Sequence, residues 1–353
     1  MGQHFFITVK EDILFRHFKN SNGWMGGPCG AVFFKGEYHV FFQNYPHAMR
    51  WGPMHWGHAV SRDLISWEER SPALIPDMSY EDGEGCLPGC ALEHDGKIYL
   101  FYTSDSASSG NSVSVASSSD GVLFEKYEGN PVLMPPEASG GRLMHPFVFE
   151  EDGTFKMVAG SVKDGLGTIY EFCSKDLFDW ELKGETETGL FLRGTIEHPA
   201  VFRVDGDRFL VFQSPADMPH RILFAREGEI FTVETGPDLY SPVVFSDEEG
   251  ESVLVGWLND RIKGTSCLSI PRKIEGDLRG DLTMMPVDAS CKYLIDESRF
   301  VEYVNGRLRI MFEGKILFDK AYKECPDLLV LEDVGTVEVF IDGGRETITC
   351  AIC

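Results

Sequence analysis

The sequence predicts an all-β chain: a five-bladed β-propeller over residues 1–285, followed by a short, truncated β-sandwich-like C-terminal region over residues 286–353. Three observations lead to this prediction. A hairpin-like unit recurs five times, and a polar turn with an aromatic residue follows the first three units. No segment keeps the 3.6-residue apolar period of an amphipathic helix, so helical folds are disfavoured.

Each repeat has a turn-like opening, a short apolar strand, a polar turn with glycine and a second apolar strand, which is the signature of a β-hairpin. The five copies are GGPCGAVFFKGEYHVFFQ (Gly26–Gln43), CLPGCALEHDGKIYLFYT (Cys86–Thr103), LMHPFVFEEDGTFKMVAG (Leu143–Gly160), IEHPAVFRVDGDRFLVFQ (Ile196–Gln213) and YSPVVFSDEEGESVLVGW (Tyr240–Trp257). Repeats of this size that consist almost wholly of strands are typical of propellers. An unrelated β-sandwich is the alternative, and five matching copies disfavour it.

The turns after the first three hairpins indicate further strands in each unit. They lead to the aromatic residues Trp67, Phe124 and Trp180, and an aromatic strand there would complete a four-stranded blade. Asp63 and Asp176 in these turns are interpreted as turn-forming residues.

The openings of the five units predict where a site would lie. In a propeller the first strand of every blade lines the central channel, so equivalent openings meet at one mouth. The openings here are Gly26-Gly27, Leu87-Pro88, Met144-His145, Glu197-His198 and Asp238-Leu239-Tyr240. A carboxylate and two imidazoles that converge at one mouth predict a functional site.

The C-terminal region also has strand-like segments. They are Phe300–Val304, Leu308–Phe312, Leu328–Leu331, Thr336–Asp342 and Glu346–Cys353. A truncated sandwich leaves sheet edges that either the propeller or a second subunit should cover. Homo-oligomerisation is therefore an open prediction.

Composition narrows the classes of partner. A formal net charge of −24 disfavours nucleic acid and anionic membranes, because both repel an acidic surface. No stretch approaches the roughly 18 apolar residues of a membrane span, and residues 1–10 lack the pattern of a signal peptide. Nine cysteines without CxxC pairs suggest neither a disulfide framework nor a zinc module. We expect a cytoplasmic protein.

One stretch of the chain has a distinctive motif, Met54-His55-Trp56-Gly57-His58-Ala59, followed by Ser61-Arg62-Asp63-Leu64 and Trp67. It is similar to the MHWGHA-x-S-x-DL-x-x-W run of glycoside hydrolase family 32, which comprises invertases, fructanases and sucrose-6-phosphate hydrolases. Further similarities are Gln43-Asn44 with Pro46 and Trp51 (QYNP-like), Gly85-Cys86 (GCFSG-like), Asp238–Pro242 (DFYAP-like), Gly256-Trp257 (GWM-like) and Leu268–Arg272 (LSLPR-like). The resemblance covers about Phe15 to Val287 and continues weakly to the C-terminus.

The resemblance implies a retaining double displacement on a fructosyl unit, in which one carboxylate attacks and a second acts as acid and base. The nucleophile motif of the family, WMNDPNG, is Trp24-Met25-Gly26-Gly27-Pro28-Cys29-Gly30 in this chain. The nucleophilic aspartate is therefore replaced by Gly27. Deletion of that side chain is expected to leave a gap about the size of a small carboxylate.

The other two catalytic motifs also differ from the family pattern. The RDP motif, whose Arg and Asp hold fructose hydroxyls, becomes Met144-His145-Pro146, and the ECP motif becomes Glu197-His198-Pro199. Only the acid/base carboxylate, Glu197, is retained. The FSG residues have become Leu87-Pro88-Gly89, which removes a hydroxyl donor from the pocket.

These correspondences define the predicted site. Glu197 is the predicted acid/base and Gly27 marks the missing nucleophile; the predicted substrate-binding residues are Trp24, Gln43, Trp51, His145, His198, Asp238 and Tyr240. The alternatives are structural: a buried acid for Glu197, core imidazoles for His145 and His198, and core packing for the tryptophans. His55 and His58 are interpreted as packing residues.

The sequence thus predicts a carbohydrate-active protein of the β-fructosidase lineage, which acts on a small or oligosaccharide glycoside through Glu197 without the usual nucleophile. The alternative is a non-catalytic sugar-binding or regulatory propeller. We expect no cofactor and no metal. A metal site built from Cys29, Cys86, Cys90, His145 and His198 is the main rival for the pocket, and no spacing motif supports it.

Overall fold

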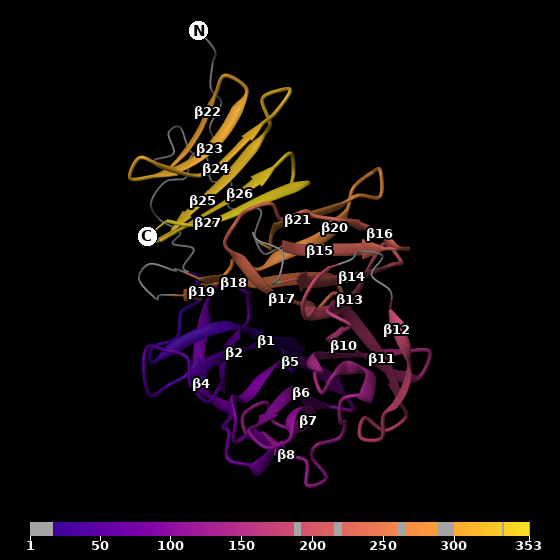
Figure 1. The fold of residues 1–353 in the computed structure, drawn as a ribbon. Helices are drawn as coiled ribbons and strands as arrows, with labels where there is room; N and C mark the ends of the chain where they lie inside the picture. Colours follow the sequence, from indigo (N-terminus) through magenta and orange to yellow (C-terminus); the bar gives the residue numbers. More distant parts are fainter. Residues whose placement is uncertain are drawn as a thin grey trace.

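The computed structural model describes residues 17–186, 192–214, 221–259, 266–287, 300–333 and 335–352. Apart from two 3-10 turns, η1 (Ser79–Glu81) and η2 (Glu137–Ser139), all regular structure in these ranges is β-strand (Figure 1). The prediction of an all-β chain is confirmed. Within the same ranges, no helix has the length and apolar character needed to cross a membrane.

Five antiparallel sheets follow one another along the chain. The first contains β1 (Trp24–Phe34), β2 (Glu37–Tyr45), β3 (His55–Ser61) and β4 (Trp67–Leu74). The second contains β5 (Gly85–His94), β6 (Lys97–Ser106), β7 (Gly110–Ser118) and β8 (Glu125–Lys126). The third contains β9 (Met144–Glu151), β10 (Thr154–Lys163), β11 (Leu166–Ser174) and β12 (Glu181–Thr186). The fourth contains β13 (Glu197–Val204), β14 (Asp207–Ser214), β15 (Arg221–Arg226) and β16 (Glu229–Phe231). The fifth contains β17 (Leu239–Ser246), β18 (Ser252–Asn259), β19 (Ser266–Leu268), β20 (Arg272–Gly276) and β21 (Leu282–Pro286).

All five predicted hairpins are present, because the first two strands of every sheet pair antiparallel. The sequence explains four of their turns. Each has two central residues with positive φ, the requirement of the two-residue turn that matches strand twist. The pairs are Lys35-Gly36, Asp95-Gly96, Asp152-Gly153 and Asp205-Gly206. Glycine adopts this conformation without strain, which is why it recurs at the second position.

The first strands of the five sheets form a ring. β1 contacts β5, β5 contacts β9, β9 contacts β13, β13 contacts β17, and β17 contacts β1. Five hydrophobic clusters each take side chains from two neighbouring sheets, including one cluster between the first and the fifth sheet. A cavity lined by all five first strands lies near their C-terminal ends. The core therefore sits between the faces of adjacent sheets around a common axis.

The pairing of each first strand with its neighbour in the sheet is irregular. The register shifts within β1, β5, β13 and β17 near the start of the strand, and β9 shows the same shift against β10. Three residues at these bulges have left-handed backbones: His145 (φ 52°), His198 (φ 49°) and Ser241 (φ 50°). Bulges redirect side chains and are common beside functional sites.

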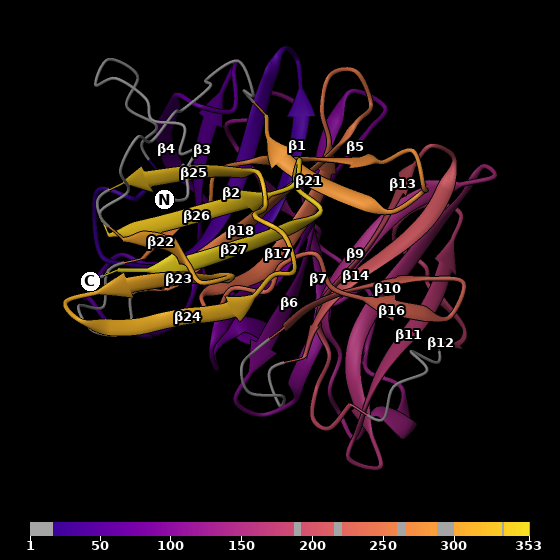
Figure 2. The same cartoon turned by 90° about the horizontal axis from the view of Figure 1, so that it is seen from above.

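Two three-stranded sheets follow the ring, in the upper part of Figure 1. They comprise β22 (Val301–Val304), β23 (Arg307–Phe312) and β24 (Lys315–Ala321), then β25 (Leu328–Asp333), β26 (Thr336–Ile341) and β27 (Glu346–Ala351). One hydrophobic cluster takes residues from both sheets, among them Leu308, Ile310, Val339 and Ile348. Strand β24 was not predicted, and most of its residues are exposed. Figure 2 shows the same strands from above.

A buried ion-pair network joins the C-terminal sheets to the ring. Arg272 on β20 is fully buried, and its two terminal nitrogens donate to Glu234 and Glu338, each at 2.7 Å. His17 Nε2 lies 2.7 Å from Glu338, and its Nδ1 lies 3.0 Å from Asp333. These carboxylates raise the pKa of His17 to about 9 against the opposing effect of burial. We call these five residues the junction network.

Candidate functional site

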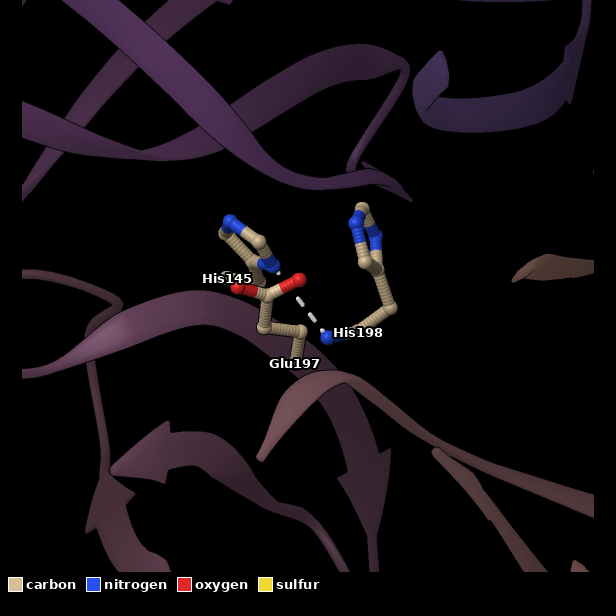
Figure 3. Close-up of side chains that lie close together, drawn as sticks. All are labelled: His145, Glu197 and His198. Carbon is tan, nitrogen blue, oxygen red and sulfur yellow. Dashed lines mark hydrogen bonds between the residues drawn. The ribbon is translucent and has the colours of Figure 1, made fainter. Parts of the chain in front are cut away.

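Three ionisable side chains meet at the start of β13 and β9. Glu197 and His198 are consecutive on β13, and His145 is the second residue of β9. One ligand-type atom from each lies within 4.8 Å of the other two, and the imidazole centroids are 4.2 Å apart. Figure 3 shows the Glu197 carboxylate in front of the His145 ring, with His198 beside both. We call His145, Glu197 and His198 the mouth cluster.

The bulges explain how these side chains are held. The His145 N–H donates to Thr103 Oγ1 of the preceding sheet at 2.8 Å, and the His198 N–H donates to His145 Nδ1 at 3.2 Å. The Ser241 N–H likewise donates to Gln213 Oε1 at 2.6 Å. Left-handed backbone is costly for residues other than glycine. At each of these three bulges, a hydrogen bond from the backbone N–H to the preceding sheet helps to hold the left-handed residue in place.

Burial controls the protonation of the mouth cluster. It raises the pKa of Glu197 to about 7, and Arg142 opposes this by favouring the charged carboxylate. Burial lowers the pKa of His145 to about 3 and that of His198 well below its ordinary value. Both imidazoles are therefore neutral near pH 7. Among the residues that the structure describes, the Glu197 carboxylate has no hydrogen-bond or ion-pair partner.

Gly27, where the family resemblance places the missing nucleophile, does not border an empty gap, which corrects the expectation from sequence. A Cβ atom built on Gly27 would lie 2.6 Å from Ser241 Cβ and 2.7 Å from Ser241 Oγ, with Trp257 Cβ at 3.3 Å. Real Cβ atoms do not approach other atoms below 3.0 Å. Ser241 stands where the DFYAP-like motif has alanine. Its hydroxymethyl group therefore occupies part of the space that a nucleophile side chain would need.

An aromatic cluster surrounds the same position. The Trp24 ring contacts Trp51 edge-on at 5.2 Å and Trp257 at 5.9 Å, and Trp257 contacts Tyr240 at 6.0 Å between centroids. A Cβ built on Gly26 would meet the Trp24 ring at 2.7 Å. The asparagine of the family motif would not fit here without movement of Trp24. Trp51 is 47% exposed, and its contact with a sugar stays a prediction.

Three predicted substrate-binding residues make contacts within the protein. Gln43 Nε2 donates to the Cys86 carbonyl at 3.3 Å, and the Tyr240 hydroxyl donates to the Pro237 carbonyl at 3.0 Å. Asp238 Oδ2 accepts from the Ala351 N–H of β27 at 3.0 Å. These contacts direct Asp238 toward the C-terminal sheet. Sugar contact by the three residues stays a prediction.

Sequence reasoning missed Ser241, Trp257, Thr103 and Gln213 as parts of this region. A signal existed for Ser241 in the replacement of alanine within DLYSP. By contrast, the packing assignment of His55 and His58 is confirmed: both are buried, His55 against the Pro53 carbonyl and His58 against His39.

The thiol-based metal site is not supported by the geometry. Within the described ranges, the group of His, Cys, Asp and Glu side chains close enough to share an ion is the mouth cluster, and it contains no cysteine. Burial raises the pKa of the Cys29, Cys86 and Cys90 thiols, which keeps them protonated.

Comparison with known proteins matches a family model to the part of the chain that forms the five sheets. Residues 17–286 match the model of the glycosyl hydrolases family 32 N-terminal domain. The sucrose-6-phosphate hydrolase of Zymomonas mobilis is 33% identical over 304 residues, which cover 73% of this chain and 59% of that protein. The raffinose invertase of Escherichia coli is 32% identical over 313 residues, covering 77% and 64%. The chain thus spans about three fifths of the length of these curated relatives.

Solved structures show the same fold over nearly the whole chain. The β-fructofuranosidase of Bombyx mori superposes with a TM-score of 0.82 at 22% identity, covering 96% of this chain and 89% of that one. The sucrose-6-phosphate hydrolase of Lactobacillus gasseri gives 0.83 at 21% identity, with coverages of 95% and 87%.

Proposed function

The chain belongs to glycosyl hydrolases family 32, and on that premise we propose that its mouth binds a glycoside and acts on it through Glu197, with no protein nucleophile. The observation that carries the proposal is a half-buried carboxyl group at the start of β13, whose pKa burial raises to about 7 and for which the described residues offer no hydrogen-bond or ion-pair partner. A carboxyl group in this state can donate a proton near neutral pH. Its position matches the acid/base of the family motif.

The proposed reaction uses Glu197 twice. The bond between the anomeric carbon and the leaving oxygen breaks as Glu197 gives its proton to that oxygen. A water molecule then adds to the anomeric carbon and loses a proton to the Glu197 carboxylate, which restores the acid. No covalent sugar–protein bond forms in this route, because Gly27 has no attacking group.

Several features lower the expected rate. Loss of a catalytic nucleophile costs on the order of 10⁴-fold or more in other hydrolases. Met144 and His145 also replace the Arg and Asp that hold sugar hydroxyls in the family motif. The altered pocket is less polar, so its sugar need not be fructose.

A non-catalytic glycoside-binding protein is the second candidate. The contact between Ser241 and the Gly27 position supports it, since a Cβ at residue 27 would lie 2.7 Å from the Ser241 hydroxyl oxygen, which the alanine of the family motif lacks. The exposed face of Trp51 suits stacking on a sugar in either case.

Release of reducing sugar distinguishes the two candidates. Sucrose, sucrose 6-phosphate, raffinose, fructans and aryl glycosides are tested for binding and for hydrolysis by the native protein and by Glu197→Gln. We expect slow hydrolysis of at least one bound sugar, and loss of that hydrolysis in Glu197→Gln with binding retained. A sugar that binds to both proteins without any cleavage would select the binding function.

We further infer that the five sheets are the blades of the predicted propeller over residues 1–285. The ring of first strands and the clusters between neighbouring sheets support this. Residues 286–353 then form the sandwich-like region, supported by the cluster that its two sheets share. Homo-oligomerisation and a cytoplasmic location stay predictions.

A further inference from the structure

We propose that the mouth cluster is a binding site for one divalent first-row transition-metal ion, with His145, Glu197 and His198 as its protein ligands. Two imidazoles and one carboxylate are a ligand set that suits Zn²⁺, Fe²⁺ or Co²⁺ and leaves coordination positions open. The inference does not rest on the proposed function, because an ion can bind whether or not a sugar is cleaved.

The replaced motif residues carry the first argument. His145 and His198 stand where the family's RDP and ECP motifs have Asp and Cys. Both replacements are imidazoles, and the bulges bring them to the one retained carboxylate from two different strands. Loss of a sugar-holding aspartate explains one change. It does not explain why both new side chains are histidines that face Glu197.

The geometry supplies the second argument. The three ligand atoms lie within 4.8 Å of one another, whereas the edge of a tetrahedron with bonds of about 2.1 Å is about 3.4 Å. Binding therefore draws the side chains inward by about an ångström. Glu197 and the His198 ring have no hydrogen-bond partner among the described residues, so neither has to give one up. His145 Nδ1 accepts only the long 3.2 Å bond from the His198 N–H.

The bound ion would change what Glu197 can do. A carboxylate that ligates a cation is deprotonated and cannot serve as the proton donor. Metal and Glu197-dependent glycoside cleavage are therefore expected to exclude each other. The open coordination positions would instead offer contacts to water or to sugar hydroxyls.

The test is direct titration of protein stripped with a chelator. Binding of Zn²⁺ is measured by calorimetry and binding of Co²⁺ by visible absorption. Mg²⁺ is the control, because it is a hard cation that prefers oxygen ligands. We expect one Zn²⁺ per chain, a Co²⁺ spectrum that Zn²⁺ displaces, and no response to Mg²⁺. Absence of Zn²⁺ binding to the native protein would overturn the proposal.

Variants locate the ion. His145→Ala, His198→Ala and Glu197→Gln should each weaken Zn²⁺ binding at least about tenfold, the loss that even an outer partner of a ligand can produce. His47→Ala, which removes an imidazole outside the cluster, should bind as the native protein does. Circular dichroism checks that each variant is folded, and anomalous scattering places the ion in a crystal. Binding that persists in the His145→Ala/His198→Ala double variant would assign the ion elsewhere and refute the site.

Discussion

The mouth cluster and the junction network both bury ionisable groups, but they differ in whether these groups are paired with opposite charges. At the junction, Arg272 meets two carboxylates at 2.7 Å, and His17 lies against one of these carboxylates and against Asp333. At the mouth, Glu197 has no partner among the described residues. Burial of a charge is costly unless it is paired, so unpaired groups persist only where the fold holds them.

The consequence appears in the protonation of the two regions. The junction lowers the pKa of Glu338 to about 2 and raises that of His17 to about 9, so both stay charged. The mouth raises the pKa of Glu197 to about 7 and lowers those of its imidazoles. Because the junction groups are buried in ion pairs, we assign the junction a structural role. The mouth groups are buried without such pairs among the described residues, so they can take up a proton, a metal ion or a ligand.

Removal of the junction cation should have the largest effect on stability. Arg272→Met leaves Glu234 buried without its counter-ion and leaves Glu338 with His17 as its charged partner, and loss of one partner of a buried pair costs about 3–5 kcal/mol. The free energy of unfolding, measured in urea, should fall by this amount. Arg62→Met is the control, since the Arg62 side chain is 82% exposed and its ion pair with Glu37 lies at the surface. Equal effects of the two substitutions would contradict the structural role of the junction.

Much of the fold could be predicted from the sequence because its signals are local. Hairpin turns with glycine and short apolar strands gave all five hairpins, and Asp63 and Asp176 do accept backbone N–H bonds in their turns. The junction was not predicted, because its pairs lie far apart in the chain: His17 meets Glu338, and Arg272 meets Glu234.

The mouth shows the same limit. The convergence of Glu197 with two imidazoles followed from equivalent positions in the repeats, and the structure brings these side chains together. The contact of Ser241 with Gly27 could not be predicted from local patterns, since it depends on how closely the first and fifth sheets approach.

The junction should also set the alkaline limit of stability. Because the pKa of folded His17 is about 9, against about 6.5 when unfolded, its contribution is complete below pH 6.5 and is lost as the pH rises through 9. The loss is roughly 3 kcal/mol. Glu338 acts in the other direction, with stability lost only as the pH falls from 4.5 through 2.

His17→Gln tests this interpretation in urea unfolding between pH 5 and 9.5. The variant should be less stable at pH 6 and should lose less stability than the native protein as the pH rises. His94→Gln, at a partly exposed histidine, is the matched control. An unchanged alkaline slope in His17→Gln would show that another group titrates there.

The smallest effect on stability is expected at the mouth, where the question is whether a nucleophile can return. Gly27→Asp forces a Cβ to within 2.6 Å of Ser241, and overpacking of this kind costs about 1–3 kcal/mol. Gly27→Asp/Ser241→Ala removes the hydroxyl oxygen, which would lie 2.7 Å from the new Cβ, and keeps the contact between the two Cβ atoms. It should recover part of that loss in urea unfolding.

The same two variants test whether Ser241 alone prevents an aspartate at residue 27 from acting, or whether the rest of the site has also lost the geometry needed for hydrolysis. Gly27→Asp alone should give no gain in hydrolysis of an activated aryl glycoside, because the new carboxylate cannot take its place beside Ser241. The double variant should gain activity that disappears when Glu197→Gln is added. The gain should remain small, since poor positioning by Met144 and His145 can cost about 10²-fold. An equal gain in the single variant would mean that Ser241 yields easily and that the closure of the nucleophile position has no consequence for function.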